Sequence, residues 1–157
     1  MLKKYLLCFL ISMAPLIELR GAVPVALGLD LPILPAYTIC ILGNMLPVPI
    51  IYFFARKVLH WGCEKPYIGK FFAYCINKGE AGGRRLVAKA GRGGLFVALM
   101  LFVGIPLPGT GAWTGTLAAA FLNMGFRATV SAVSLGVVIA GIIMGLGATG
   151  VFSIIGL

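Results

Sequence analysis

The chain has 157 residues, of which 61% are hydrophobic and 11% are charged. A typical soluble domain is about 45–50% apolar and about 25% charged. A domain of this size could not remove so much apolar surface from water, so the composition excludes an ordinary soluble protein and predicts an all-α membrane protein. The net charge of +9 does not indicate nucleic acid binding, because the basic residues share the chain with long apolar runs and form no folded basic module.

The basic residues concentrate in the middle of the chain. Nine of the 13 lysines and arginines are Arg56, Lys57, Lys65, Lys70, Lys78, Arg84, Arg85, Lys89 and Arg92. A basic loop between apolar segments marks the cytoplasmic side of a membrane. Apolar residues recur at helical spacing over residues 67–76, which predicts a basic amphipathic helix in the interface. We expect the glycines at 79, 82 and 83 to end this helix.

Six apolar runs flank the loop, at residues 5–17, 22–29, 33–55, 95–105, 112–124 and 129–157. A bilayer core of about 30 Å requires about 20 helical residues. Only residues 33–55 and 129–150 are long enough to cross alone. The other four runs form two pairs, and each arm of these pairs reaches about 12–20 Å at about 1.5 Å per residue.

Each pair could be one broken helix that crosses, or a re-entrant hairpin that returns to its starting side. For the second pair, Arg127 lies just beyond the returning arm, and the positive-inside rule favours a hairpin. For the first pair, a hairpin would place Lys3 and Lys4 outside, which disagrees with the same rule, and the charges there are too few to decide.

The whole chain, residues 1–157, is expected to form a single transmembrane domain. It would consist of a hairpin and spanning helix (1–55), the basic cytoplasmic loop (56–92), and a second hairpin and spanning helix (93–157). One spanning helix separates the two units, so the second is inverted relative to the first. Inverted repeats with broken helices are the architecture of many secondary transporters.

Two charged residues, Glu18 and Arg20, lie at the break in the first pair. An ionisable group in lipid costs roughly 2.5–3.5 kcal/mol, so such groups usually face a cavity or a partner. In an unwound turn before Gly21 and Pro24, both could face one cavity. Glu18 could then exchange a proton, and Arg20 could hold an anionic group such as a phosphate. The alternative is a structural ion pair that pins the hairpin tip.

The break in the second pair is rich in proline and glycine, which end a helix and permit a sharp reversal. A helix starting near Ala112 would point its N-terminal amides at this break, which is a favourable place for an anion. The candidate site residues here are Pro108, Gly109, Thr110, Gly111, Trp113 and Thr114. The alternative is a tight turn without a binding role.

Asn44 lies in the middle of residues 33–55, where it could bond to a neighbouring helix or line the cavity. Small residues along 129–150 predict close helix packing, including contacts within a homodimer. The four cysteines, Cys8, Cys40, Cys63 and Cys75, have no metal-ligand spacing and are interpreted as unpaired thiols. We find no catalytic constellation, so an enzyme and a cofactor are not expected.

Three segments, at residues 18–24, 43–49 and 108–115, resemble the bacterial and archaeal small multidrug export protein family. That family is distantly similar to the DedA membrane proteins, which carry two re-entrant hairpins with charged residues near their tips. Some DedA relatives are implicated in moving polyprenyl-phosphate lipids across the membrane. The resemblance implies a multi-pass transporter in the cytoplasmic membrane of a prokaryote.

Three functional hypotheses follow from these observations. The first is a secondary transporter or lipid flippase, with a midplane site between the hairpin tips, that moves a small amphiphile or phosphate-bearing lipid with proton coupling. The second is a non-transporting membrane scaffold that acts through the basic loop and its contacts with membrane lipids. The third is export of cationic amphiphiles, with Glu18 binding the cation directly.

Overall fold

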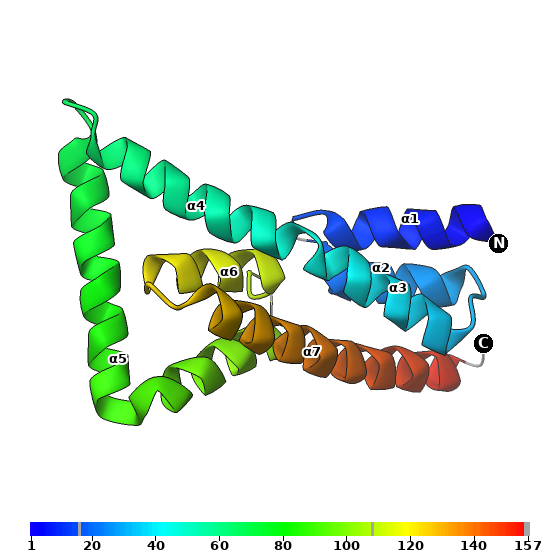
Figure 1. The fold of residues 1–157 in the computed structure, drawn as a ribbon. Helices are drawn as coiled ribbons and strands as arrows, with labels where there is room; N and C mark the ends of the chain where they lie inside the picture. The colour runs from blue at the N-terminus through cyan, green and yellow to red at the C-terminus, as the bar shows by residue number, and fades with distance from the viewer. Residues whose placement is uncertain (16, 108, 156–157) are drawn as a thin grey trace.

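The computed structural model describes residues 1–15, 17–107 and 109–155, which are helical with no strand. The helices are α1 (Leu2–Met13), α2 (Glu18–Gly28), α3 (Ile33–Met45), α4 (Pro47–Cys63), α5 (Gly69–Gly104), α6 (Ala112–Phe121) and α7 (Phe126–Ile155). Figure 1 shows α1, α3, α4, α6 and α7 running roughly along one direction, with the first part of α5 lying across one end. The N-terminus and the end of α7 lie at the opposite end.

Helices α1 and α2 form an antiparallel hairpin. The Nζ of Lys4, near the start of α1, donates a hydrogen bond of 2.9 Å to the carbonyl oxygen of Leu29, just past the end of α2. Helix α1 ends at Met13, because the ring of Pro15 disfavours helical geometry at the preceding residue. The expected break at residues 18–21 was therefore wrong in position. The chain reverses before Glu18, and Glu18 begins α2.

Helices α3 and α4 together form the long apolar segment Ile33–Cys63, which includes the predicted span 33–55. The two helices join at Leu46, and Pro47 occupies the first turn of α4, where its missing N–H would have no helical partner. Close packing holds α3 against α1, because a Cβ at Gly43 would lie 2.6 Å from the carbonyl oxygen of Phe9.

Helix α5 runs through the glycines at 79, 82 and 83, so the prediction that they end the amphipathic helix was wrong. The helix instead bends at Gly91, which has φ 70° and ψ 177°. Gly79 and Gly83 pack on the backbone at the C-terminal end of α6, at Phe121 and Leu122. A Cβ at position 83 would lie 2.5 Å from the carbonyl oxygen of Leu122. These glycines therefore permit a close helix–turn contact rather than a break.

The end of α5 and α6 turn back on each other, as expected for the second pair. Helix α5 ends at Gly104 and α6 begins at Ala112, which confirms the predicted break between them. Gly115 of α6 packs closely against Val103, with Leu99 beside it. Because Leu122 lies beside Gly83, the chain returns to the level of the amphipathic helix before α7 begins.

Within the described residues, three helical segments are long and apolar enough to cross a membrane: Ile33–Cys63, Val87–Gly104 and Phe126–Gly147. The sequence analysis expected two spanning helices. The additional segment arises because α5 continues from the basic region into the first arm of the second pair, with the bend at Gly91 inside it. The prediction of an all-helical, multi-pass membrane protein is confirmed at this level.

The main core contains buried residues from each of α1 to α7. Its largest fully buried side chains include Leu19, Val23, Val103, Val133 and Val137. A polar contact joins α4 to the turn before α7, since the Tyr52 hydroxyl donates a 2.5 Å hydrogen bond to the carbonyl oxygen of Met124. The core thus holds the helices of both halves in one body.

The close contact at Gly83 makes a testable prediction. Alanine at Gly83 should destabilise the protein by about 1–3 kcal/mol, because its Cβ would overlap the Leu122 carbonyl. Alanine at the neighbouring Gly82, whose nearest neighbour would be 3.7 Å away, should instead be neutral or stabilising by up to about 1 kcal/mol. Thermal unfolding of the two purified variants in detergent measures the difference, and equal midpoints would contradict the packing argument.

Candidate functional site at the junction of two hairpins

The Glu18 carboxylate joins the first hairpin to the N-terminus of α6. Its Oε2 accepts a hydrogen bond of 3.0 Å from the backbone N–H of Ala112. Its Oε1 accepts one of 3.1 Å from the backbone N–H of Trp113. The side chain is buried, with 5% exposure. Glu18 therefore supplies the negative group that the first turn of a helix favours, from a position 94 residues earlier in the chain.

The backbone around this contact is specialised. Glu18 has φ 50°, a left-handed conformation that costs a non-glycine residue about 1–3 kcal/mol and persists only where the surroundings enforce it. Gly111 precedes α6, and a Cβ there would lie 2.7 Å from the Cδ of Glu18 and overlap its Oε2. Glycine at 111 is what lets the carboxylate approach the amides of α6.

Arg20 binds the other side of the same break. Its guanidinium donates hydrogen bonds to the carbonyl oxygens of Leu107 and Ile105, the latter at 3.4 Å, and to the Oγ1 of Thr110 at 2.7 Å. Ile105 caps the C-terminus of α5, where a positive charge is favourable. The Thr110 hydroxyl also lies 2.8 and 2.9 Å from the Ile105 and Leu107 carbonyl oxygens. Arg20 thus fixes the α5–α6 loop.

Trp113 adds a third link between the hairpins. Its indole Nε1 donates a hydrogen bond of 3.2 Å to the carbonyl oxygen of Met13, the last residue of α1. Both helices of the first hairpin therefore bond to the second hairpin at this point. Met13 of α1 bonds to α6, and Glu18 and Arg20 of α2 bond to α6 and to the α5–α6 loop. Thr114 does not take part in this junction through its hydroxyl, which lies 3.5 Å from the carbonyl oxygen of Gly111 in its own segment.

The structure brings together five of the predicted site residues: Glu18, Arg20, Thr110, Gly111 and Trp113. Glu18 and Arg20 are not ion-pair partners of each other, because the only ion pair within 4.0 Å in the described parts of the chain joins Arg84 and Glu80. The alternative that Glu18 and Arg20 form an ion pair at the hairpin tip is therefore wrong. Each charge binds a different helix end of the other hairpin.

The remaining predicted residues lie apart from these contacts or cannot be placed. Gly21 lies within α2 against the side chain of Ile17, and Pro24 lies further along the same helix. Gly109 is exposed in the α5–α6 loop with φ 83°. Pro108 lies outside the described residues.

Asn44 is a polar residue in the core of the bundle. It is 1% exposed and lies on the same stripe of α3 as the buried Cys40, one turn away. Its Oδ1 has no hydrogen-bond partner among the described residues. Buried polar atoms are nearly always bonded, so this oxygen is available to a donor. The predicted interhelical bond is not made by Oδ1.

The sequence indicated the two charges and a helix start that could bind an anion. It did not indicate that the Glu18 carboxylate is the anion bound there. Sequence reasoning also missed the backbone groups of Met13, Ile105 and Leu107. Main-chain atoms leave no residue-type signal. Only the absence of hydrogen-bond partners in lipid for a broken helix indicates that some side chain must serve them.

The fold and this junction define a polytopic helical membrane protein with two broken segments bonded to each other. A family model described as "Putative small multi-drug export protein" matches residues 18–143, a range that includes all the junction residues named above except Met13. The chain belongs to this family, which confirms the resemblance seen in its motifs. Comparisons with curated proteins and with solved structures find no match.

The contact between Glu18 and Gly111 can be tested by a double-mutant cycle. Glu18→Ala should cost about 1–3 kcal/mol, because two amides of α6 lose their acceptor. Gly111→Ala should destabilise the wild-type protein but cost less in the Glu18→Ala background, where the carboxylate is gone. Contacting residues give coupling energies of about 0.5–3 kcal/mol.

Chemical or thermal unfolding of the four proteins in detergent gives this coupling. The control cycle pairs Gly111→Ala with Asp30→Ala, since Asp30 is exposed and lies between α2 and α3. That cycle should be additive. Additivity of Glu18→Ala with Gly111→Ala would contradict the close approach described here.

Proposed function

We propose that this chain is a membrane transporter whose site is the junction of two re-entrant hairpins, with Glu18 as its proton-linked carboxylate. The observation that carries the proposal is the buried Glu18 carboxylate on the first two amides of α6. The description of the family to which the chain belongs, together with the apolar helices of the chain, supports a role in export. A charge in an apolar segment is costly, and a transport role gives a reason for it to be there.

The proposed topology follows from arm lengths. Helices α1, α2 and α6 have 12, 11 and 10 residues, or about 15–18 Å each. That is about half of a 30 Å bilayer core, so the junction would lie near mid-depth. The two hairpins would enter from opposite sides, as in an inverted repeat, and the basic part of α5 would lie on the cytoplasmic surface.

The amphipathic part of α5 and the segment before it suit a membrane surface. Trp61 is exposed, as interfacial tryptophans are, and the Lys65 ammonium lies 4.7 Å from its ring centroid. A hydrogen bond with the Tyr74 hydroxyl raises the pKa of Lys78, so this lysine stays charged at the surface. The positive face then lies against anionic headgroups.

The chemistry at the junction links a proton to an anion. As a carboxylate, Glu18 accepts from both α6 amides. As a carboxylic acid it would carry no charge and would accept more weakly, so protonation would loosen α6 from the first hairpin. The freed amides and the Arg20 guanidinium could then hold an anionic group of a lipid or amphiphile. Loss of the proton would restore the internal bond and release that group.

Two other functions remain as competing proposals. If the transported molecule is a cationic amphiphile, Glu18 would bind the cation directly and neutralisation of Glu18 would abolish binding. If the protein is a scaffold, transport would be absent, and neutralising Arg84, Arg85 and Lys89 would abolish function while changes at the junction were tolerated.

Thiol labelling tests the proposed topology. Cys63 and Cys75, at the amphipathic end, should react with a membrane-impermeant maleimide only from the cytoplasmic side. The thiol added in an Asp30→Cys variant, at the other end of the bundle, should react only from outside. Cys8 and Cys40 are fully buried and serve as unreactive internal controls. Reaction of Cys75 from outside would show that the protein has the opposite orientation in the membrane.

Reconstituted transport tests the role of Glu18. Proteoliposomes would be assayed with a fluorescent phosphatidylglycerol and, separately, with ethidium, each with and without a pH gradient. Glu18→Gln should lower the gradient-driven transport rate at least about tenfold, which corresponds to about 1.4 kcal/mol. A thermal unfolding measurement should show that the variant is still folded. The matched control Asp30→Asn removes an exposed carboxylate and should transport normally.

The two probes separate the proposals. Movement of the anionic lipid supports the proton–anion exchange, and movement of ethidium alone supports the cationic substrate. Wild-type rates in Glu18→Gln would rule out the site assignment. Movement of neither probe by the wild-type protein would favour the scaffold.

A further inference from the structure

A cavity lies away from the hairpin junction, inside the bend of α5. Its volume is about 690 Å³, and its walls are residues 80–95 of α5 and the segment from Leu122 to Ala128. Small-molecule sites in proteins span about 300–1,000 Å³. The bend at Gly91, with φ 70°, creates the angle between the two arms of α5. The cleft is therefore a product of the fold and is large enough for a ligand.

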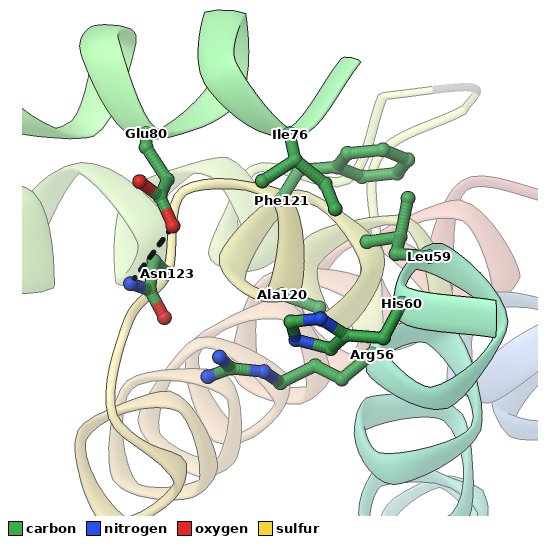
Figure 2. A pocket seen from close by; sticks show the side chains of 8 residues that line it. All are labelled: Arg56, Leu59, His60, Ile76, Glu80, Ala120, Phe121 and Asn123. Atoms are coloured by element: carbon green, nitrogen blue, oxygen red, sulfur yellow. Dashed lines mark hydrogen bonds between the residues drawn. The ribbon is translucent and has the colours of Figure 1, made fainter. Parts of the chain in front are cut away.

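A smaller neighbouring cavity helps to define its limits. Figure 2 shows this space, which is lined by Arg56, His60, Glu80 and Asn123 among others, and in which the Asn123 amide donates to Glu80. Its volume is about 20 Å³, enough for about one water molecule. Glu80 and Asn123 line both spaces, so they form the partition between them. Only the larger cleft could hold a ligand.

The rim of the larger cleft is basic. Arg84 and Arg92 line it. Glu80, which is half-buried, lies 3.8 Å from the exposed Arg84 as an i,i+4 pair, and such pairs near the surface are worth little. In the described part of the chain, Arg92 makes no hydrogen bond or ion pair. One guanidinium is thus free, and a second is held only by a weak surface pair.

The floor of the cleft is apolar. Its lining includes Val87, Leu95, Leu122, Met124 and Ala128. Leu95 and Met124 are buried beneath it. These residues lie where α5 passes from its basic part into the apolar segment Val87–Gly104. The cleft therefore combines an arginine rim with an apolar wall at the start of a membrane segment.

We infer that this cleft binds one anionic phospholipid, with its phosphate at Arg84 and Arg92 and the upper part of an acyl chain along the apolar floor. Guanidinium groups bind phosphate oxygens in pairs of hydrogen bonds. A free phosphate would use only the rim and leave the apolar floor facing water, so the amphipathic lining selects a lipid. The inference is independent of the transport proposed at Glu18.

Lipid binding to the full-length protein in detergent tests this inference. Native mass spectrometry and thermal unfolding would be followed during titration with phosphatidylglycerol, phosphatidylcholine and inorganic phosphate. Phosphatidylglycerol should bind tightest and raise the unfolding midpoint. The double variant Arg84→Gln/Arg92→Gln should weaken phosphatidylglycerol binding roughly 10–30-fold.

The matched control is Arg85→Gln/Lys89→Gln. It removes the same charge from the same helix, but neither residue lines the cleft, so binding should change less than about twofold. Equal weakening in both double variants would overturn the site in favour of general attraction to the basic helix. Equal affinity for the two lipids, or for inorganic phosphate and phosphatidylglycerol, would overturn recognition of an anionic lipid.

A neutral variant protects the test against misfolding of the arginine variants. Ala88 lines the cleft, and Ala88→Trp would fill part of it without any change of charge. This variant should lose phosphatidylglycerol binding while its unfolding midpoint without lipid stays near wild type. Ala90→Trp, on the same helix outside the cleft, should bind normally. Full binding by Ala88→Trp would overturn the proposed location.

Discussion

The structure depends on two charges from one short segment, which bind the end of one helix and the start of the next. The backbone between α5 and α6 lies outside both helices, and several of its polar groups find their partners within the protein. Glu18 binds the amides at the start of α6, and Arg20 binds the carbonyl oxygens at the end of α5. Each charge has the sign that the helix terminus favours.

This arrangement explains how a buried carboxylate and a half-buried guanidinium are each stabilised without a direct ion pair. An isolated charge in an apolar medium is very unfavourable, and Glu18 and Arg20 are not joined directly in an ion pair. Instead, the partial charges of two helix termini and the Thr110 hydroxyl take the place of water. The unpaired backbone groups at the two helix ends and the two charges are each unfavourable alone. They stabilise each other at one point of the bundle, where Gly111 permits the close approach of Glu18.

Much of the architecture could be predicted from the sequence. Hydropathy located the helices, and the proline and glycine residues located the break between α5 and α6. The first break was misplaced because Pro15, rather than the charged residues, ends α1 there. The glycines at 79 and 83 were misread, since glycine in a helix can mean either an end or a close contact. The choice between a helix end and a close contact depends here on the backbone carbonyl groups of Phe121 and Leu122, which are more than 35 residues away along the chain.

The site was predictable in composition but not in connectivity. The charges of the first motif and the helix start of the second were each identifiable, because both are unusual in an apolar chain. That they satisfy one another could not be read from spacing, since the contact spans 94 residues. The cleft within α5 was also hidden, because it exists only through the bend at Gly91 and the return of α6.

The separation of these partners along the chain has a consequence for biogenesis. If the first hairpin inserts as proposed, α6 does not yet exist at that stage of synthesis, so we expect Glu18 and Arg20 to lack their partners 94 and 90 residues later until those are made. Full insertion of that hairpin is therefore tied to the arrival of the second half of the chain. Closing a loop of this length carries only a modest entropic cost, and the delay is set by translation. We therefore expect the junction between the two hairpins to form only after the α5–α6 loop and α6 have been synthesised.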